Sequence, residues 1–197
     1  MDYISALLSK PSTKDLGLLL LDYYNSLMKT LTTEQLALLL STIERNHEKI
    51  GRPQYFGKFR AFLFEEYIMK RIINHLNTQK NIVFEWEPCI EISKDYCIEV
   101  DILASQILPD NSTKYLLGIE CKVELDASRL KEALANLILI KAKYPHILAF
   151  IVFFKKDVSE RLIDIALKYI DGIVEVSHKN DELDLIIKRL HNLLETF

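Results

Sequence analysis

Glycine and proline are scarce in this chain, with five of each among 197 residues. Both residues interrupt helices and strands, so a chain that has few of them has little room for long loops. Hydrophobic residues make up 49% and charged residues 27%, which excludes a disordered or collagen-like chain. We therefore expect mostly regular structure, in one domain or in one domain with a helical appendage.

Cysteine is also scarce. The three cysteines, Cys89, Cys97 and Cys121, are odd in number and have no Cys-x-x-Cys spacing. This excludes a structural zinc ribbon and a four-cysteine iron–sulfur cluster, and it argues against a disulfide framework. We expect the cysteines to be reduced and the protein to be intracellular.

Several sequence signals that would assign other functions are missing. The apolar stretch at residues 16–21 is far shorter than a membrane span, and the first residues lack the pattern of a signal peptide. No glycine-rich phosphate loop or Gly-x-Ser-x-Gly motif occurs. The sequence thus predicts a soluble, cytoplasmic protein that uses neither a membrane nor a nucleotide cofactor.

The net charge is −3, but the charges are segregated along the chain. Residues 45–60 contain five basic residues against one glutamate, whereas residues 157–197 are acidic. A globally basic nucleic-acid coat protein is excluded, but a local basic patch is not.

Residues 1–50 are predicted to form a helical hairpin. The first helix has an apolar stripe at three- and four-residue steps, made of Leu16, Leu20, Tyr24, Leu27 and Leu31. Thr32 and Gln35 form a capping box that begins the second helix. The hairpin either packs on the rest of the fold or forms a dimer interface, and residues 51–197 form the second domain.

The second domain alternates between helices and strands. A helix is expected at 58–77, followed by strands at 82–92, 97–107 and 114–123, a helix from 126 to 143, a strand at 146–154, a helix ending near 171, a strand at 173–176 and a helix at 181–194. This order predicts an α/β sandwich with a central mixed sheet. Strands 97–107 and 114–123 should pair as an antiparallel hairpin, and strand 146–154 should be parallel to 114–123.

Two of these strands carry charged residues in apolar surroundings. Because side chains alternate along a strand, Glu120 and Lys122 emerge on the same face. Asp101 can meet Glu120 if the two strands pair as a hairpin. Two carboxylates at one point repel each other, and a hard divalent cation would join them. A glutamate of the preceding helix, Glu65 or Glu66, lies in the segment expected beside these strands. A lysine that only pairs with the two carboxylates is the alternative.

The segments Ile98–Leu103 and Gly118–Val123 resemble the PD-(D/E)xK nuclease superfamily, which includes restriction endonucleases, archaeal Holliday-junction resolvases and Mrr-type nucleases. The resemblance implies a restriction endonuclease-like α/β/α core with a central mixed sheet, here preceded by the N-terminal helical hairpin. Val100 occupies the position of the motif's proline. A Gln-x-x-x-Tyr element is not evident after Lys122, which makes this chain unlike the helicase-associated and CRISPR-associated branch.

The resemblance also implies residue roles. Asp101 and Glu120 match the metal-binding acids, Lys122 matches the catalytic lysine, and Cys121 would lend its main-chain carbonyl to the metal. Helical spacing favours Glu66 over Glu65 as the helix carboxylate. The metal would be Mg²⁺ or Mn²⁺, which lowers the pKa of a water and polarises the phosphoryl oxygen.

The basic segment then becomes a candidate nucleic-acid interface. Its residues Arg52, Lys58 and Arg60 alternate with the aromatics Tyr55, Phe56 and Phe59. We therefore predict a metal-dependent endonuclease that hydrolyses DNA phosphodiester bonds, directed to a junction or flap, and acting as a homodimer. The alternatives are a nucleic-acid-binding module with weak or no catalysis on the same fold, and a structural interaction protein.

Overall fold

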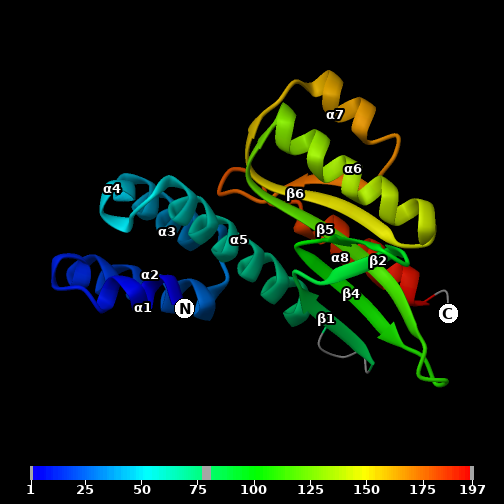
Figure 1. Ribbon diagram of the computed structural model, residues 1–197, viewed down its shortest axis with the longest axis horizontal. Coiled ribbons are helices and arrows are strands. Elements are labelled where there is room, and N and C mark those ends of the chain that lie inside the picture. The colour runs from blue at the N-terminus through cyan, green and yellow to red at the C-terminus, as the bar shows by residue number, and fades with distance from the viewer. Residues whose placement is uncertain (1, 77–80, 196–197) are drawn as a thin grey trace. The chain divides into compact units, whose positions relative to one another are not determined.

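The computed structural model describes residues 2–76 and 81–195, and it divides into two compact units, residues 1–70 and 71–197. Figure 1 labels the elements of both units. The first unit holds α1 (Asp2–Leu8), a 3₁₀ turn η1 (Pro11–Thr13), α2 (Lys14–Thr30), α3 (Thr33–Arg45), α4 (His47–Ile50) and most of α5 (Pro53–Leu76). The second holds β1 (Ile82–Trp86), β2 (Cys89–Ser93), β3 (Tyr96–Glu99), β4 (Ile102–Ile107), β5 (Thr113–Asp126), α6 (Ala127–Lys143), β6 (Leu148–Asp157), α7 (Glu160–Ala166), β7 (Gly172–Glu175) and α8 (Leu183–Glu195). Across the described ranges, no helix has the length and apolar character that crossing a membrane requires.

The predicted helical pair of the first unit corresponds to α2 and α3. Leu31 ends α2 in a left-handed conformation with a φ of 51°, and its N–H donates to the carbonyl of Leu27. Thr32 begins α3, and its side-chain oxygen accepts a hydrogen bond from the N–H of Gln35 at 3.4 Å, as the capping box predicts. The short helices α1 and α4 were not predicted.

The helix predicted at 58–77 begins five residues earlier. Pro53 is its first residue, a position where the missing N–H costs no helical hydrogen bond. Within the first unit α5 is tied to the α2–α3 pair, because the Tyr67 hydroxyl donates to the carbonyl of Leu31 at 3.3 Å. The aromatic ring of Tyr67 is fully buried.

The second unit is built on a five-stranded mixed sheet with the order β1-β4-β5-β6-β7. The β1–β4 and β4–β5 pairs are antiparallel, whereas the β5–β6 and β6–β7 pairs are parallel. The predicted β4–β5 hairpin and the parallel crossover through α6 are therefore confirmed. Asp126 caps α6 as predicted, since its carboxylate accepts from the N–H groups of Ser128 and Arg129, both at 2.9 Å.

Helices cover both faces of this sheet. On one face α6 and α7 pack on alternate residues of β6, among them Ile151 and Phe153. On the other face Arg189 of α8 lies over the ring of Phe150, 5.9 Å from its centre. Figure 1 shows α6 and α7 on one side of the strands and α8 on the other. This is the three-layer α/β/α arrangement that the alternating elements predict.

Two of the predicted strands are broken in the structure. The segment 82–92 forms β1 and β2, with Glu87 at a positive φ of 48° between them, and the segment 97–107 forms β3 and β4. β2 and β3 pair with each other in a separate two-stranded sheet. This β2–β3 hairpin packs against α6, where Ile90 and Ile98 share a buried cluster with Ile140.

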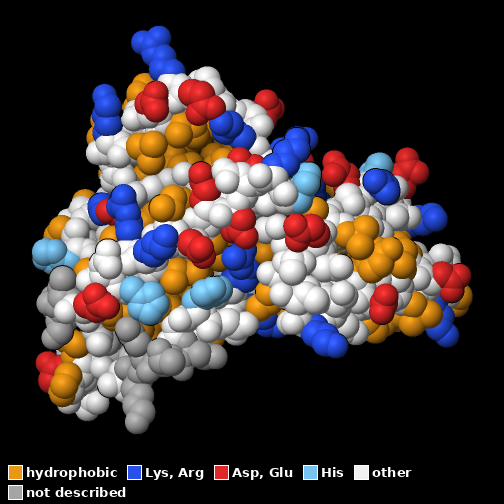
Figure 2. Space-filling model, turned by 180° about the vertical axis from the view of Figure 1, so that it is seen from behind, with side chains coloured by type: hydrophobic (Ala, Val, Ile, Leu, Met, Phe, Trp, Pro, Cys, Tyr) orange, Lys and Arg blue, Asp and Glu red, His pale blue; other side chains and the backbone are white. Residues whose placement is uncertain are grey.

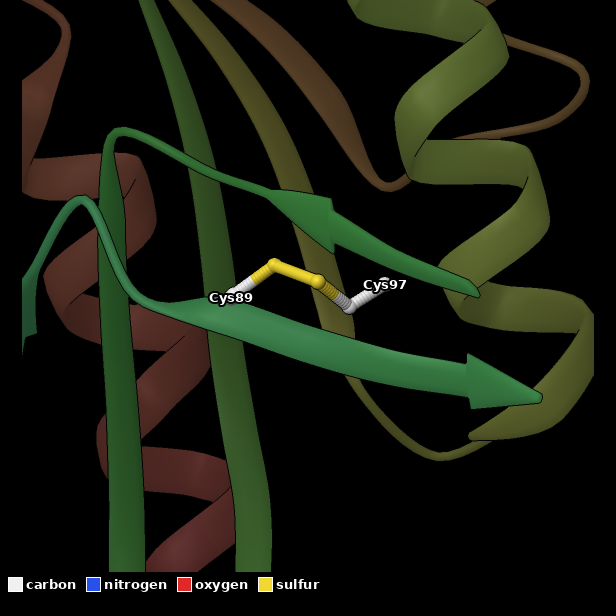
Figure 3. The surroundings of a disulfide bond; sticks show 2 residues. All are labelled: Cys89 and Cys97. Carbon is white, nitrogen blue, oxygen red and sulfur yellow. A yellow bond between two sulfur atoms is a disulfide. The ribbon is translucent and has the colours of Figure 1, made fainter. Parts of the chain in front are cut away.

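The hairpin contains a disulfide bond between Cys89 and Cys97, so the prediction that the cysteines are unpaired is wrong for these two. Their Cα atoms lie 5.6 Å apart because β3 folds back on β2, where Cys97 pairs with Glu91 (Figure 3). From the sequence, the two cysteines were expected in the strands 82–92 and 97–107, and no pairing between these two strands was predicted. The third cysteine, Cys121, is free and buried.

We expect the disulfide to stabilise the second unit. It closes a loop between residues eight positions apart, for which the chain-entropy model gives about 2.5 kcal/mol. The double variant Cys89→Ser/Cys97→Ser should lower the free energy of unfolding by about this amount in urea denaturation. A reducing agent should shift the wild-type transition similarly and leave the double variant unchanged. Equal midpoints for oxidised and reduced wild type would contradict the stabilising role.

Candidate active site

The two candidate carboxylates come from neighbouring antiparallel strands. Ile102 of β4 is paired with Ile119 of β5, so Asp101, one residue earlier, lies beside Glu120. Asp101 is also the point where the chain passes from the small sheet to the main sheet, and its carbonyl accepts from the N–H of Glu87 at 3.1 Å. The break before β4 therefore positions Asp101 beside the middle of β5.

Lys122 joins the two carboxylates. Its Nζ lies 2.7 Å from Oε2 of Glu120 and 3.3 Å from Oδ2 of Asp101. The same Oδ2 accepts a hydrogen bond of 2.5 Å from the backbone N–H of Cys121. Glu120 is only 3% exposed, whereas Lys122 and Asp101 are half-buried. The structure thus brings Asp101, Glu120 and Lys122 together, as strand alternation predicts; we call these three residues the acidic–lysine triad.

The sequence analysis missed a fourth contributor, Asn136 of α6. Its side-chain amide nitrogen donates to Oε1 of Glu120 at 3.0 Å, so both carboxylate oxygens of Glu120 have partners. Asn136 lies beside the stripe of buried residues by which α6 packs on the sheet, which includes Ala133 and Leu137. A lone polar residue at the edge of that stripe was the available signal.

The charges of the triad are strongly coupled. Burial raises the pKa of Glu120; Lys122 opposes this shift, and the nearby carboxylate of Asp101 adds to it. For Lys122, burial alone would lower the pKa, but the carboxylates of Asp101 and Glu120 outweigh it and the pKa is raised. Lys122 is therefore a cation at neutral pH and acts as a hydrogen-bond donor, not as a base.

The donor set of the triad fits a hard divalent cation. Two carboxylates supply oxygen ligands of the kind that Mg²⁺ and Mn²⁺ prefer, and their repulsion is relieved here by a single ammonium group. No group of three or more His, Cys, Asp or Glu side chains able to hold a metal ion occurs in residues 2–76 and 81–195. A cation at this site would need further ligands, such as main-chain carbonyls or water.

Both candidate glutamates of α5 are buried in the first unit. Oε1 of Glu66 accepts from the Tyr24 hydroxyl at 2.9 Å and lies 2.9 Å from Nζ of Lys70. Oε2 of Glu66 is buried and has no hydrogen-bond partner among the described residues. Burial, together with the hydrogen bond to Glu66, raises the pKa of Tyr24 to about 12. A buried carboxylate oxygen for which residues 2–76 and 81–195 supply no hydrogen bond is unusual and calls for an explanation.

The candidate nucleic-acid residues lie at the start of α5. Lys58 and Arg52 are exposed, and the Arg60 guanidinium lies over the ring of Phe56, 5.2 Å from its centre. Phe59, by contrast, is 1% exposed and stacks on Tyr3, so it belongs to the core and is not a surface for base stacking.

Comparisons with known proteins match this chain by structure and not by sequence. The PspGI restriction endonuclease in complex with substrate DNA aligns with 100% of this chain and 93% of its own, with a TM-score of 0.56 and 12% identity. The type IIF restriction endonuclease Bse634I with cognate DNA aligns with 87% of this chain and 92% of its own, with a TM-score of 0.54 and 13% identity. No family model and no curated protein sequence matches the chain. The fold is restriction endonuclease-like, with the predicted central mixed sheet between helices.

If the triad binds a cation, Asp101→Asn should weaken binding of Mn²⁺, because the variant removes one anionic ligand. We expect Mn²⁺ to raise the melting temperature of the wild type and its affinity to fall by more than about tenfold in the variant, as calorimetry would measure. Asp164→Asn, an exposed aspartate of α7, is the matched control and should bind like the wild type. Equal Mn²⁺ affinity in Asp101→Asn and wild type would exclude this cation site.

Proposed function

We propose that this protein is a metal-dependent nuclease of the PD-(D/E)xK superfamily that hydrolyses phosphodiester bonds in DNA. The observation that carries the proposal is the acidic–lysine triad, because it combines two converging carboxylates and an ammonium group at one point of a restriction endonuclease-like sheet. Carboxylates that hold a cation and a lysine that stabilises negative charge are the groups phosphodiester hydrolysis requires.

Each residue of the triad has a distinct role in this proposal. Asp101 and Glu120 would hold the cation, and the main-chain carbonyl of Cys121 would be a further ligand. Lys122 donates hydrogen bonds that orient the attacking water and stabilise the charge that develops on the phosphate. Asn136 is a positioning residue, because it holds the carboxylate of Glu120 in one orientation. The bound Mg²⁺ or Mn²⁺ supplies a Lewis acid and makes the water more acidic.

Residues of the first unit complete the proposal. Glu66, whose Oε2 accepts no hydrogen bond from the described residues, is assigned as the helix carboxylate in preference to Glu65. Arg52, Lys58 and Arg60 are assigned to contact with the DNA backbone. We keep residues 51–197 as the nuclease domain and assign residues 1–50 to assembly.

The proposal includes two alternative classes of DNA substrate. The first class is a junction or flap, as predicted from the sequence. PspGI and Bse634I are restriction endonucleases described with substrate and cognate DNA, which favours a site in duplex DNA. A cleavage assay on junction, flap, single-stranded and duplex substrates, with Mg²⁺, Mn²⁺ or EDTA, decides between these classes.

The alternative is a DNA-binding module in which the triad is only a structural ion cluster. The favouring observation is that Lys122 forms ion pairs with both carboxylates. Such a protein would bind DNA without cleaving it, and Mn²⁺ would not stabilise it.

The Lys122→Ala variant tests the chemistry. We expect cleavage to fall by about a hundredfold or more, because the variant removes the donor that stabilises the developing charge. The free energy of unfolding should also fall, by about 1–3 kcal/mol, since Glu120 stays buried without its ammonium partner. Cleavage rates should therefore be measured below the melting temperature of the variant.

Lys131→Ala is the matched control, because Lys131 is an exposed lysine of α6 outside the triad. It should cleave at the wild-type rate. A folded Lys122→Ala protein that cleaves as fast as the wild type would show that the lysine has no role in the reaction.

We propose further that the nuclease is a homodimer and that the α2–α3 pair forms its interface. Two-fold symmetry gives one active site for each strand of a symmetric duplex. Leu18, Leu19 and Leu38 of these helices are 50%, 41% and 39% exposed, although leucine is usually buried.

Light scattering at micromolar concentration should give the mass of a dimer. The variant Leu18→Lys/Leu38→Lys should convert it to a folded monomer, because it places charges on the exposed apolar face. The matched variant Leu139→Lys/Leu185→Lys changes two similarly exposed leucines of the second unit and should remain a dimer. A wild-type monomer, or a dimer that survives the first variant, would count against this interface.

A further inference from the structure

A pocket of about 460 Å³ lies at the end of β6 and β7 in the second unit. Its lining residues come from β6, β7 and the turn that follows β7: Phe154, Lys155, Lys156, Glu175, Ser177, His178 and Lys179. Three lysines face a single glutamate here, although residues 157–197 as a whole are acidic. On the face that Figure 2 shows, basic and acidic side chains are mixed. We call the seven residues that line this pocket the lysine pocket.

The sheet register relates the lysine pocket to the acidic–lysine triad. Lys122 of β5 is paired with Phe153 of the parallel strand β6, and Glu124 with Lys155. Lys155 is two residues further along β6 than Phe153, the partner of Lys122, which is about 7 Å along the strand. Because side chains alternate along a strand, Lys155 and Lys122 lie on the same face of the sheet.

The turn that carries Lys179 is held in a fixed conformation. The buried hydroxyl of Ser177 donates to Oε1 of Glu175 at 2.6 Å. It also accepts hydrogen bonds from the N–H of Lys179 at 3.1 Å and of Asn180 at 3.3 Å. One oxygen of the Glu175 carboxylate is therefore engaged in a hydrogen bond inside the turn.

The lysines of the pocket differ in their present partners. Lys156 is paired with Glu160 on α7. Among the residues that the structure describes, neither Lys155 nor Lys179 has an ion-pair partner. Both are exposed, so their ammonium groups remain available to an anion at the pocket.

We infer that the lysine pocket binds a backbone phosphate of the DNA strand, next to the phosphodiester at the acidic–lysine triad, through Lys155 and Lys179. The inference rests on the proposed function, because the triad defines the position of the strand. Lys155 and Lys179 are positioning residues in it, since they contact the substrate backbone away from the reacting phosphate. A contact of this kind carries no sequence information but sets the register of the strand.

The test measures the affinity for a duplex oligonucleotide at several salt concentrations without divalent cation, so that it does not depend on catalysis. Lys155→Ala/Lys179→Ala should reduce the slope of log affinity against log salt by about 0.9, the value for one lost phosphate contact. Lys168→Ala/Lys188→Ala changes two exposed lysines outside the pocket and should leave the slope unchanged. An unchanged slope in the pocket variant, or a wild type that binds no duplex, overturns the inference.

Hydrolysis of bis(p-nitrophenyl) phosphate with Mn²⁺ separates this inference from the proposed function. This small diester does not extend to the lysine pocket, so the pocket variant should hydrolyse it at the wild-type rate while its KM for DNA rises. If the wild type hydrolyses the small diester and the pocket variant binds DNA normally, only the pocket inference fails. If no diester is hydrolysed but the salt slope falls as expected, the nuclease proposal fails and the phosphate contact stands.

A free phosphate ion shares the chemistry of the DNA backbone and is the other source of an anion for this pocket. Calorimetry with inorganic phosphate distinguishes the two. Phosphate binding that is lost in the pocket variant, together with unchanged affinity for duplex DNA, would overturn the inference. Weak or absent phosphate binding together with the reduced salt slope supports it.

Discussion

Two carboxylates and one ammonium group meet at the centre of β5, and the local structure depends on keeping these charges compensated. Glu120 is buried, so it needs both Lys122 and Asn136 to satisfy its oxygens. Asp101 is held by the N–H of Cys121, which requires the antiparallel register of β4 and β5. Three elements must therefore be in place at once: the β4–β5 hairpin, the parallel crossover and the face of α6 that carries Asn136.

Much of this frame could be predicted because the relevant signals are local. Alternation along residues 116–123 places Glu120 and Lys122 on the same face whatever the rest of the chain does. Aspartate is a favoured N-cap residue, so the beginning of α6 could be predicted at Asp126. In the structure its carboxylate accepts hydrogen bonds from two backbone N–H groups. The hairpin turn and the apolar strand after α6 then fixed the order of β4, β5 and β6. The contact of Asp101 with Lys122 follows from that order and from one register.

The parts that could not be predicted depend on contacts between distant residues. The break between β1 and β2 falls at Glu87 and Pro88, within the segment 82–92 that was predicted as a single strand. The β2–β3 hairpin exists only because the chain breaks there, and it is this hairpin that brings Cys89 and Cys97 together. The disulfide was therefore missed together with the β2–β3 hairpin. Asn136 was missed because its partner lies sixteen residues away on another element. The early start of α5 at Pro53 was missed because Gly51 and Pro53 were taken as a longer interruption.

The disulfide makes the stability of the β2–β3 hairpin depend on the redox state of its surroundings. Both of its cysteines are exposed to solvent, and the hairpin that it closes ends at Glu99, two residues before Asp101. Oxidising compartments preserve such a bond, whereas cytosolic thiol systems remove it. In a reducing compartment, the segment leading to Asp101 would be held only by backbone pairing and by its packing on α6. The redox state of the surroundings therefore decides whether a covalent bond constrains the hairpin that ends two residues before Asp101, a candidate catalytic carboxylate.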